Sequence, residues 1–330
     1  MKYLLTGGRQ RLRGSKIKEW EGYDRGVLLE LDSSNLSLKP VLEYESPPDC
    51  VPEGNRSSIT FKSCSLWNDQ VVAATQTEVM LISISNQSIS CRVSLPGFND
   101  VHHAFVNSAE NFVVTSTGLD SVMEVDFDGH LVNEWHVLGG STWDHFDKDT
   151  DWRKVLTTKP HMSHPNHCVE IDGELWVTRL EQRDFTNLNT GESISIPYER
   201  PHDGFVLGED VLFTHVNGLM SRVHMPTRES SVLHDANQSH TGKESLGWCR
   251  GLWTSDMATL LVGFTRIRPT KYEESLEWMK RRLTDAASWY GSFPTRVVSI
   301  DVGSGVVNWQ VDTEKLGINA IFSILPVAKA

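Results

Sequence analysis

The sequence predicts an all-β protein, a six-bladed β-propeller with four-stranded blades in one domain, residues 1–330. Three observations support this. Short apolar or alternating runs recur along the chain, turn residues separate them, and one four-run unit repeats six times with divergent sequence. Units of four strands around an axis are typical of propellers. A pair of two-sheet β-sandwiches is the alternative, and the sixfold recurrence favours the propeller.

The runs can be followed from unit to unit. Residues 68–95 contain three of them, Q-V-V-A-A-T, E-V-M-L-I-S-I-S and I-S-C-R-V-S-L, and residues 110–137 repeat the plan with D-F-D-G-H as a hairpin turn. The remaining units lie in residues 172–197, 208–234, 259–312 and 2–45. We therefore expect an inner strand, two middle strands and an outer strand in each unit.

The two ends of the chain are expected to complete one blade together. Residues 318–327, I-N-A-I-F-S-I-L-P-V, read as an innermost strand, and residues 2–8, K-Y-L-L-T-G-G, read as a second strand. Such a closure covers sheet edges that would otherwise pair with other chains. Two insertions lengthen the blades, at residues 140–160 and 271–291. Apolar residues at helical spacing predict a helix in the second insertion.

Composition narrows the class of partner. The formal net charge of −12 argues against nucleic-acid binding, which needs a basic surface. The five cysteines are scattered without a C-x-x-C pair, as in reduced cytoplasmic proteins. No run approaches the length of a membrane span. We expect a cytoplasmic protein with a small-molecule substrate and no membrane contact; the sequence leaves the oligomeric state open.

Histidines stand where the inner strands begin, around one mouth of the central channel. Three consecutive segments, D-V-H-H, H-P-N-H and R-P-H-D, carry histidine there, and the next carries Arg250. Side chains alternate along a strand, so only one of His102 and His103 is expected to face the axis. The predicted ring takes one member from each of three sets: His102 or His103, His164 or His167, and His202.

Three converging imidazoles predict a divalent metal centre. Catalytic zinc takes three protein ligands and a water, and imidazole also suits iron. A lone histidine at a strand end is usually hydrogen-bonded instead, so the prediction depends on the shared register of all three. Arg250 is expected to hold a substrate carboxylate or phosphate, and Asp100 to orient His102 or act as a base. Further substrate-binding candidates are Arg266, Arg268, His103 and His167.

Several motifs resemble a widespread bacterial family of uncharacterised six-bladed β-propeller proteins. Residues 247–270 and 297–327 resemble its C-terminal strands, R-G-L-x-F and I-F-D-V-x-x-L-P among them. Its D-I-H, H-x-N-G and P-H motifs are matched by residues 100–102, 164–166 and 201–202. The chain departs from the family at His103, His167, Thr265 and Arg266. The resemblance implies no activity, but it favours His102, His164 and His202 as the metal ligands.

A second resemblance is architectural. Peptidyl-hydroxyglycine lyases are six-bladed propellers in which three histidines hold zinc at the channel, and the predicted ring is similar to that arrangement. Fold analogy alone is a weak warrant for activity.

We therefore expect a metal-dependent lyase, hydrolase or isomerase that acts on a small anionic substrate by Lewis acid catalysis. The alternatives are a non-haem iron oxygenase at the same site, a metal-free lyase, and a non-enzymatic propeller that binds protein or glycan. The insertion at residues 140–160 is expected to form a lid.

Overall fold

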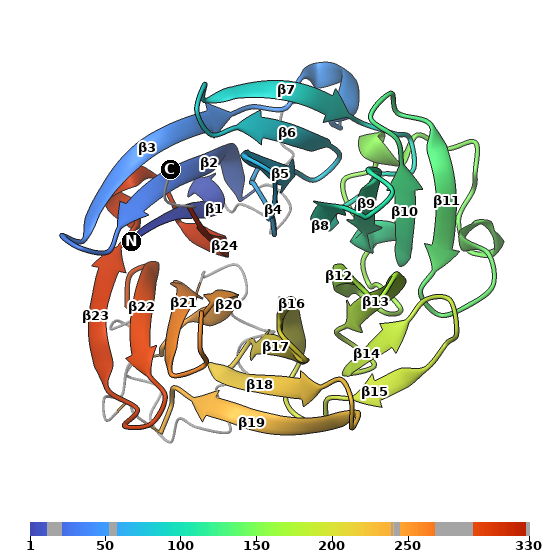
Figure 1. Ribbon diagram of the computed structural model, residues 1–330. Helices are drawn as coiled ribbons and strands as arrows, with labels where there is room; N and C mark the ends of the chain where they lie inside the picture. The colour runs from blue at the N-terminus through green and yellow to red at the C-terminus, as the bar shows by residue number, and fades with distance from the viewer. Residues whose placement is uncertain (12–21, 53–57, 239, 241–244, 268–292, 328–330) are drawn as a thin grey trace, which may run out of the picture.

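Six four-stranded sheets stand around a central axis in the computed structural model of the chain (Figure 1). The structure describes residues 1–11, 22–52, 58–238, 240, 245–267 and 293–327. In each sheet one strand lies nearest the axis and another forms the rim, as Figure 1 shows. The predicted six-bladed β-propeller with four-stranded blades is thereby confirmed. The helix expected in residues 271–291 falls outside the described residues.

Each blade runs outward from an inner strand at the axis to an outer strand at the rim. The closing blade contains β24 (Ala320–Pro326), β1 (Lys2–Gln10), β2 (Tyr23–Asp32) and β3 (Ser37–Tyr44). The next two contain β4 (Ser65–Trp67), β5 (Gln70–Ala74), β6 (Val79–Ser83) and β7 (Ser88–Val93), then β8 (Val101–Val106), β9 (Phe112–Ser116), β10 (Ser121–Val125) and β11 (Leu131–His136). The fourth contains β12 (Pro165–Ile171), β13 (Glu174–Arg179), β14 (Asp184–Asn187) and β15 (Ser193–Ser195). The last two contain β16 (Pro201–Leu207), β17 (Asp210–His215), β18 (Leu219–His224) and β19 (Glu229–Asp235), then β20 (Trp248–Trp253), β21 (Thr259–Thr265), β22 (Arg296–Asp301) and β23 (Val307–Asp312).

The two ends of the chain close the ring in one blade. β24 pairs antiparallel with β1, with Leu5 opposite Ile324. The approach is close at Gly7, where a Cβ would lie 2.0 Å from the Ala320 carbonyl oxygen, so a glycine is required there. Val327, the last described residue, donates its backbone N–H to the Lys2 carbonyl at 2.9 Å, and β1 and β24 lie side by side in Figure 1, so the predicted closure by both termini is confirmed.

Six apolar clusters hold the blades together, one between each pair of neighbours. Successive residues of a middle strand enter opposite clusters: Leu4 packs toward β5 and β6, and Leu5 packs toward β21 and β22. This is why the middle strands are apolar at nearly every position instead of alternating. Full burial of one such side chain contributes roughly 1.5–3 kcal/mol.

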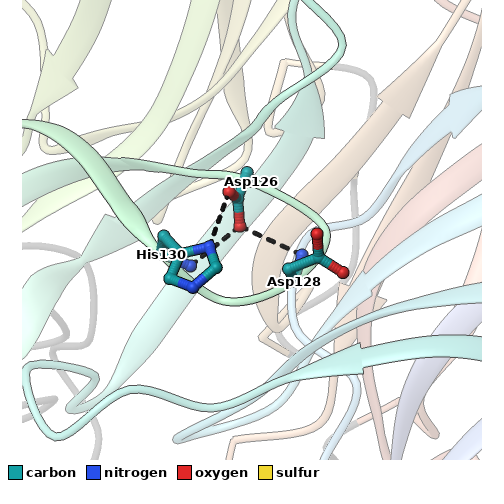
Figure 2. A group of neighbouring side chains, drawn as sticks. All are labelled: Asp126, Asp128 and His130. Carbon is teal, nitrogen blue, oxygen red and sulfur yellow. Dashed lines mark hydrogen bonds and ion pairs between the residues drawn. The ribbon is translucent and has the colours of Figure 1, made fainter.

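The D-F-D-G-H segment forms the hairpin turn that the sequence predicts. The Asp126 carboxylate accepts the backbone N–H groups of Asp128 at 3.0 Å and His130 at 2.8 Å, as Figure 2 shows. Gly129 has φ +90°, which a glycine adopts without strain. The three side chains are thus explained by the turn between β10 and β11.

Two segments add detail to the predicted fold. The inner strand β4 is short and begins at Ser65, and in the segment before it Phe61 and Lys62 donate their backbone N–H groups to the carbonyls of Gly7 and Ala74 on neighbouring strands. The insertion at residues 140–160 contains two 3₁₀ turns, η4 (Thr142–Asp144) and η5 (Trp152–Lys154). None of the helices in the described part of the chain has the length and apolar content needed to cross a bilayer.

Candidate active site at the mouth of the channel

Four consecutive inner strands, β8, β12, β16 and β20, carry a bulge at the mouth. Their pairing shifts between Val101 and His103, Pro165 and His167, His202 and Phe205, and Cys249 and Leu252. A bulge sets two residues opposite one and interrupts the alternation of side chains. His102 consequently lines a cavity at the mouth, while His103 lines the channel below it. Both side chains thus line the central space, at different levels, and which of them would meet a metal stays a prediction.

The mouth cavity is small and basic. The volume that the centre of a water molecule can occupy is about 90 Å³, enough for several waters or a small ligand. Among the described residues, the charged and imidazole side chains in its lining are those of Lys62, Asp100, His102, Lys159, His164 and Arg250. The described lining thus has three basic groups and one acidic group, although the chain has a formal net charge of −12. A cavity lined in this way attracts an anion.

His102 is held in one tautomer by Asn166. The Asn166 amide nitrogen donates to the Pro201 carbonyl at 3.2 Å, so the amide oxygen faces His102 Nδ1 at 3.0 Å. Nδ1 must therefore carry the hydrogen, and Nε2 carries the lone pair. Burial lowers the pKa of His102 to about 4, although Asp100 acts in the opposite direction. The ring is consequently neutral at neutral pH.

Asp100 and Lys62 form a buried ion pair beside this ring. The Lys62 Nζ donates to Asp100 Oδ1 at 3.2 Å, and the same oxygen lies 3.3 Å from His102 Nε2. Burial raises the pKa of Asp100, but the Lys62 ammonium opposes this, and the net effect holds that pKa well below its ordinary value. Burial lowers the pKa of Lys62, and Asp100 opposes this. Nε2 and Oδ1 are thus two acceptors that face each other, and a proton or a donor hydrogen of a ligand can bridge them.

His164 stands next to His102 and is positioned by Asp120. The Asp120 carboxylate accepts the backbone N–H groups of residues 162–164 at 2.8 to 3.1 Å. The His164 ring meets His102 edge-on with 4.8 Å between centroids, and its Nδ1 lies 2.8 Å from Nδ1 of His161. Burial, together with His102 and His161, holds the pKa of His164 well below its ordinary value. A neutral imidazole pair of this kind shares one hydrogen.

Arg250 is oriented by His202 and Phe322. Its Nη2 donates to His202 Nε2 at 2.7 Å, so that ring nitrogen is an acceptor. The Arg250 guanidinium and the Lys62 ammonium each lie 5.4 Å from the centroid of the Phe322 ring. Cations are stabilised over an aromatic face. Phe322 therefore offsets part of the repulsion between these two like charges.

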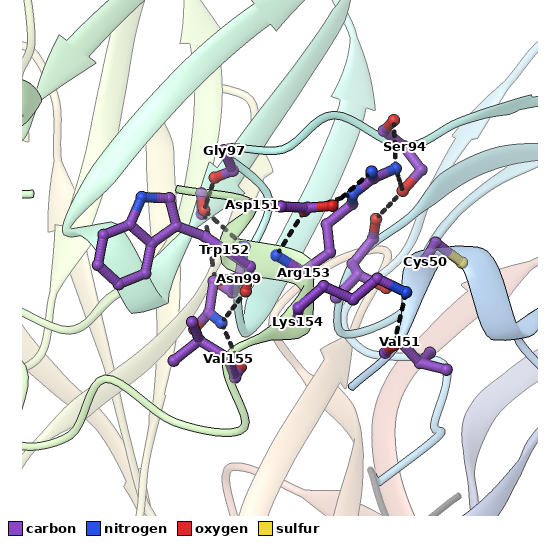
Figure 3. Close-up of polar contacts among 12 residues, drawn as sticks. Cys50, Val51, Ser94, Gly97, Asn99, Asp151, Trp152, Arg153, Lys154 and Val155 are labelled. Atoms are coloured by element: carbon purple, nitrogen blue, oxygen red, sulfur yellow. Dashed lines mark hydrogen bonds and ion pairs between the residues drawn. The ribbon is translucent and has the colours of Figure 1, made fainter. Parts of the chain in front are cut away.

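The insertion at residues 140–160 is fastened to the loops around it. The Asn99 amide nitrogen donates to the carbonyls of Trp152 at 2.7 Å and Val155 at 2.8 Å, as Figure 3 shows. In the same view Lys154 Nζ donates to the Val51 carbonyl at 3.0 Å. These bonds satisfy backbone groups that regular secondary structure does not pair.

The insertion forms a wall of the cavity. Its last residues, among them Leu156, Thr157 and Lys159, line the mouth. Trp143 and Trp152, expected in a lid, pack instead against the apolar cluster between the blades of β5 and β9. The insertion therefore places a basic side chain at the mouth while its tryptophans anchor it.

Below the mouth, the axis is a wider channel. It measures about 480 Å³ on the same scale and is lined by residues from the inner strands of all six blades. His103 and His167 stack in it with 3.5 Å between ring centroids at 17°. Burial holds the pKa of His103 well below its ordinary value and lowers that of His167 to about 3. These two substrate-binding candidates thus lie in the channel, outside the mouth cavity.

The three predicted metal ligands do not meet at one point. His202 Nε2 accepts from Arg250, so His202 stands behind that side chain. In the described part of the chain, the only three His, Cys, Asp or Glu side chains with ligand atoms all within 4.8 Å are those of the exposed turn at residues 126–130. A centre of His102, His164 and His202 remains a prediction, and it would require His202 to exchange Arg250 for the ion.

The two remaining predicted residues, Arg266 and Arg268, are not found in the described cavity lining. Arg266 makes a bidentate ion pair with Glu314 at 2.7 and 2.8 Å and does not line the cavity. Arg268 lies outside the described residues.

Sequence reasoning missed Lys62, Lys159, His161, Asn166 and Phe322. Lys62 and Asn166 could have been found, because both stand in segments that lead into inner strands.

Comparison with known proteins gives the fold and no activity. No protein-family model and no curated protein matches the chain. A Bacteroides caccae protein of unknown function is similar over 99% of both chains, with 14% identity and a TM-score of 0.60. A chain of a nidogen/laminin complex is similar over 98% of this chain and 97% of its own, with 9% identity and a TM-score of 0.57. Virginiamycin B lyase from Staphylococcus aureus aligns over 72% and 69%, with 16% identity and a TM-score of 0.43.

Proposed function

We propose that the mouth cavity is the active site of an enzyme that binds a small carboxylate or phosphate compound and removes a proton from it. Many lyase and isomerase reactions include such a step. The observation that supports the proposal is the placement of one neutral histidine of fixed tautomer among three basic side chains. Basic groups hold the anion, and a positioned imidazole is the commonest general base.

Each residue has a distinct role in this proposal. Arg250 and Lys159 bind the anionic group, and His202 orients Arg250 from behind. His102 accepts the proton at Nε2, the ring nitrogen that carries the lone pair. Asp100, kept ionised by Lys62, then lies 3.3 Å from the new N–H and stabilises the imidazolium. The lowered pKa of His102 in the free site rises when a bound anion offsets the nearby cations.

Binding is tested first, with acetate and inorganic phosphate as probes in calorimetry. We expect at least one of them to bind, and Arg250→Gln to weaken binding about tenfold or more because it removes a charged donor. Arg266→Gln is the matched control, since Arg266 pairs with Glu314 away from the cavity. Equal affinity in wild type and Arg250→Gln contradicts the proposed site.

Proton removal is tested without knowledge of the substrate. A panel of small carboxylic acids is incubated with the protein in D₂O, and deuterium uptake at carbon is measured by mass spectrometry. We expect uptake with one or more acids, lost in His102→Asn and kept in His130→Asn, a substitution in the exposed turn. Uptake that persists in His102→Asn shows that another group is the base.

A metal-dependent version of this activity is the second candidate, with zinc or iron on His102, His164 and His202. The observation in its favour is that the His102 and His164 rings are neighbours with 4.8 Å between centroids, and that both are neutral, the form in which imidazole binds a metal. The test is elemental analysis of untagged protein after reconstitution with zinc and with iron. About one equivalent, lost in His164→Ala, supports the metal; a trace amount rejects it.

A further inference from the structure

The mouth cavity and the axial channel meet at one level of the propeller. Residues adjacent along an inner strand divide between the two spaces, the first lining the mouth and the second the channel. Two such pairs are His102 and His103 on β8, and Arg250 and Gly251 on β20; Lys62 and Ser63, just before β4, divide in the same way. On β24, Ile321 lines the mouth and Ser323 the channel, with Phe322 between them. Four blades therefore share a boundary between the two spaces, and a side chain at this level can separate them.

Phe322 is that side chain. It is the one described residue that lines both spaces, and it is nearly buried at 8% exposure. Lys62 and Arg250 hold its ring from the mouth side. On strand β24 its backbone is fixed by Ser63, which donates its hydroxyl hydrogen to the Phe322 carbonyl at 3.2 Å.

The spaces on its two sides differ in chemistry. The mouth carries three basic groups, whereas the described lining of the channel contains no lysine or arginine and includes Glu170 and Asp203. Apolar side chains, Phe105, Phe205 and Leu252 among them, contribute much of the channel lining. An anionic group thus belongs in the mouth, and an alkyl chain attached to it would fit the channel if the floor were open.

We propose that Phe322 is the floor of the mouth cavity and limits its ligands to short-chain anions. The inference rests on the proposed function, since it concerns the ligand of the same site. A cavity of about 90 Å³ accepts an acid of a few carbons, while the channel below offers about 480 Å³. Phe322 is therefore the specificity-determining residue for ligand length, and removing its ring should join the two spaces.

The test measures calorimetric affinities of acetate, butyrate, hexanoate and octanoate at one pH and ionic strength. In wild type we expect affinity to fall as the chain lengthens. In Phe322→Ala, octanoate should gain about tenfold or more relative to acetate because its chain enters the channel, whereas loss of the ring beside Arg250 and Lys62 affects both acids alike. Phe322→Leu, a smaller change to the packing, should give an intermediate gain. Unchanged octanoate affinity in both variants, with acetate binding retained, overturns the inference.

A control and an independent measurement separate this inference from the proposed function. Phe205→Ala shortens another phenylalanine of the channel, below the floor, and should leave the length preference unchanged. Crystal structures of wild type and Phe322→Ala show directly whether the spaces join. If no acid binds wild type, the proposed function fails and the crystal structures alone decide the floor. A floor that stays closed in Phe322→Ala overturns the inference whatever the anions do.

Discussion

At the scale of a single residue, the chemistry of His102 is set by a neighbour that never enters the cavity. Asn166 bonds the Pro201 carbonyl with its nitrogen and His102 Nδ1 with its oxygen. If the amide were turned around, its oxygen would face the Pro201 carbonyl, another acceptor, and its nitrogen would be directed at the ring. The backbone of the next blade therefore decides which nitrogen of His102 presents a lone pair.

This makes the tautomer of His102 a prediction. Nitrogen-15 NMR of the imidazole should show hydrogen on Nδ1 in wild type. In Asn166→Leu, which has similar volume but no acceptor, the hydrogen should move to Nε2, where Asp100 lies 3.3 Å away. His130, exposed and bonded to Asp126 within its own turn, serves as internal control. Wild-type protein with hydrogen on Nε2 would rule out His102 as the base of the proposed reaction.

At the scale of the element, the bulges bring neighbouring side chains of one strand to the same central space, which a regular strand does not do. A straight strand sends neighbouring side chains to opposite faces. The register shift after Val101 lets His102 and His103 both reach the axis, one above the other. The same shift recurs in three further inner strands, so the central space has two levels with separate linings. Bulges commonly re-aim side chains next to active sites.

The insertion at residues 140–160 depends on one side chain for its position. Asn99→Asp keeps the shape of Asn99 but removes both donors to the Trp152 and Val155 carbonyls. We expect the free energy of unfolding to fall by about 1–3 kcal/mol, because two acceptors lose their partner and a carboxylate faces them. Hydrogen exchange should quicken in residues 150–160, and the anion probe should bind more weakly because Lys159 is less well placed.

The matched control for this prediction is Asn308→Asp, the same change on the exposed strand β23. It should leave both the unfolding free energy and the exchange of residues 150–160 close to wild type. Unchanged exchange in Asn99→Asp would show that packing of Trp152 in the apolar cluster, and not these hydrogen bonds, holds the insertion.

At the scale of the whole molecule, polar contacts join consecutive blades around the mouth. Lys62 bonds Asp100, His102 bonds Asn166, and Asn166 bonds Pro201, so four blades are linked in turn. The link between His202 and Arg250 extends the series to a fifth blade. Because each contact crosses a blade interface, the site exists only when the ring is closed. The seam between β1 and β24 is thus a condition for the site as well as for stability.

This scale also explains what the sequence could predict. The sixfold repeat and the paired termini predict the fold, because the periodicity of each strand can be recognised within a short segment of sequence. The register of the strand entries predicts that Asp100, His102, His164 and Arg250 share one cavity. It does not predict that Arg250 bonds His202, since contacts across blades depend on side-chain direction after a bulge. Nor does it reveal the role of Lys159, which an insertion without a periodic pattern brings to the mouth.

The buried histidines should make the whole protein sensitive to acid. Burial lowers the pKa of His102 to about 4, of His167 to about 3 and of His215 to about 4, whereas in the unfolded chain each has a pKa of roughly 6.5. Between pH 6.5 and 4 the unfolded state therefore binds more protons at these histidines than the folded state does. The stability these neutral rings contribute is complete above pH 6.5 and is lost as the pH falls.

The measurement is the free energy of unfolding in urea at several pH values from 7.5 to 4.5. Each such histidine should add a slope approaching about 1.4 kcal/mol per pH unit below pH 6.5. Burial raises the pKa of Asp203, which acts in the opposite direction and offsets part of the loss. His167→Phe keeps a ring stacked on His103 but removes one titrating group, so its slope should be smaller by about 1 kcal/mol per pH unit. An identical slope in that variant would mean that His167 is protonated in the folded protein, and that the channel admits charge.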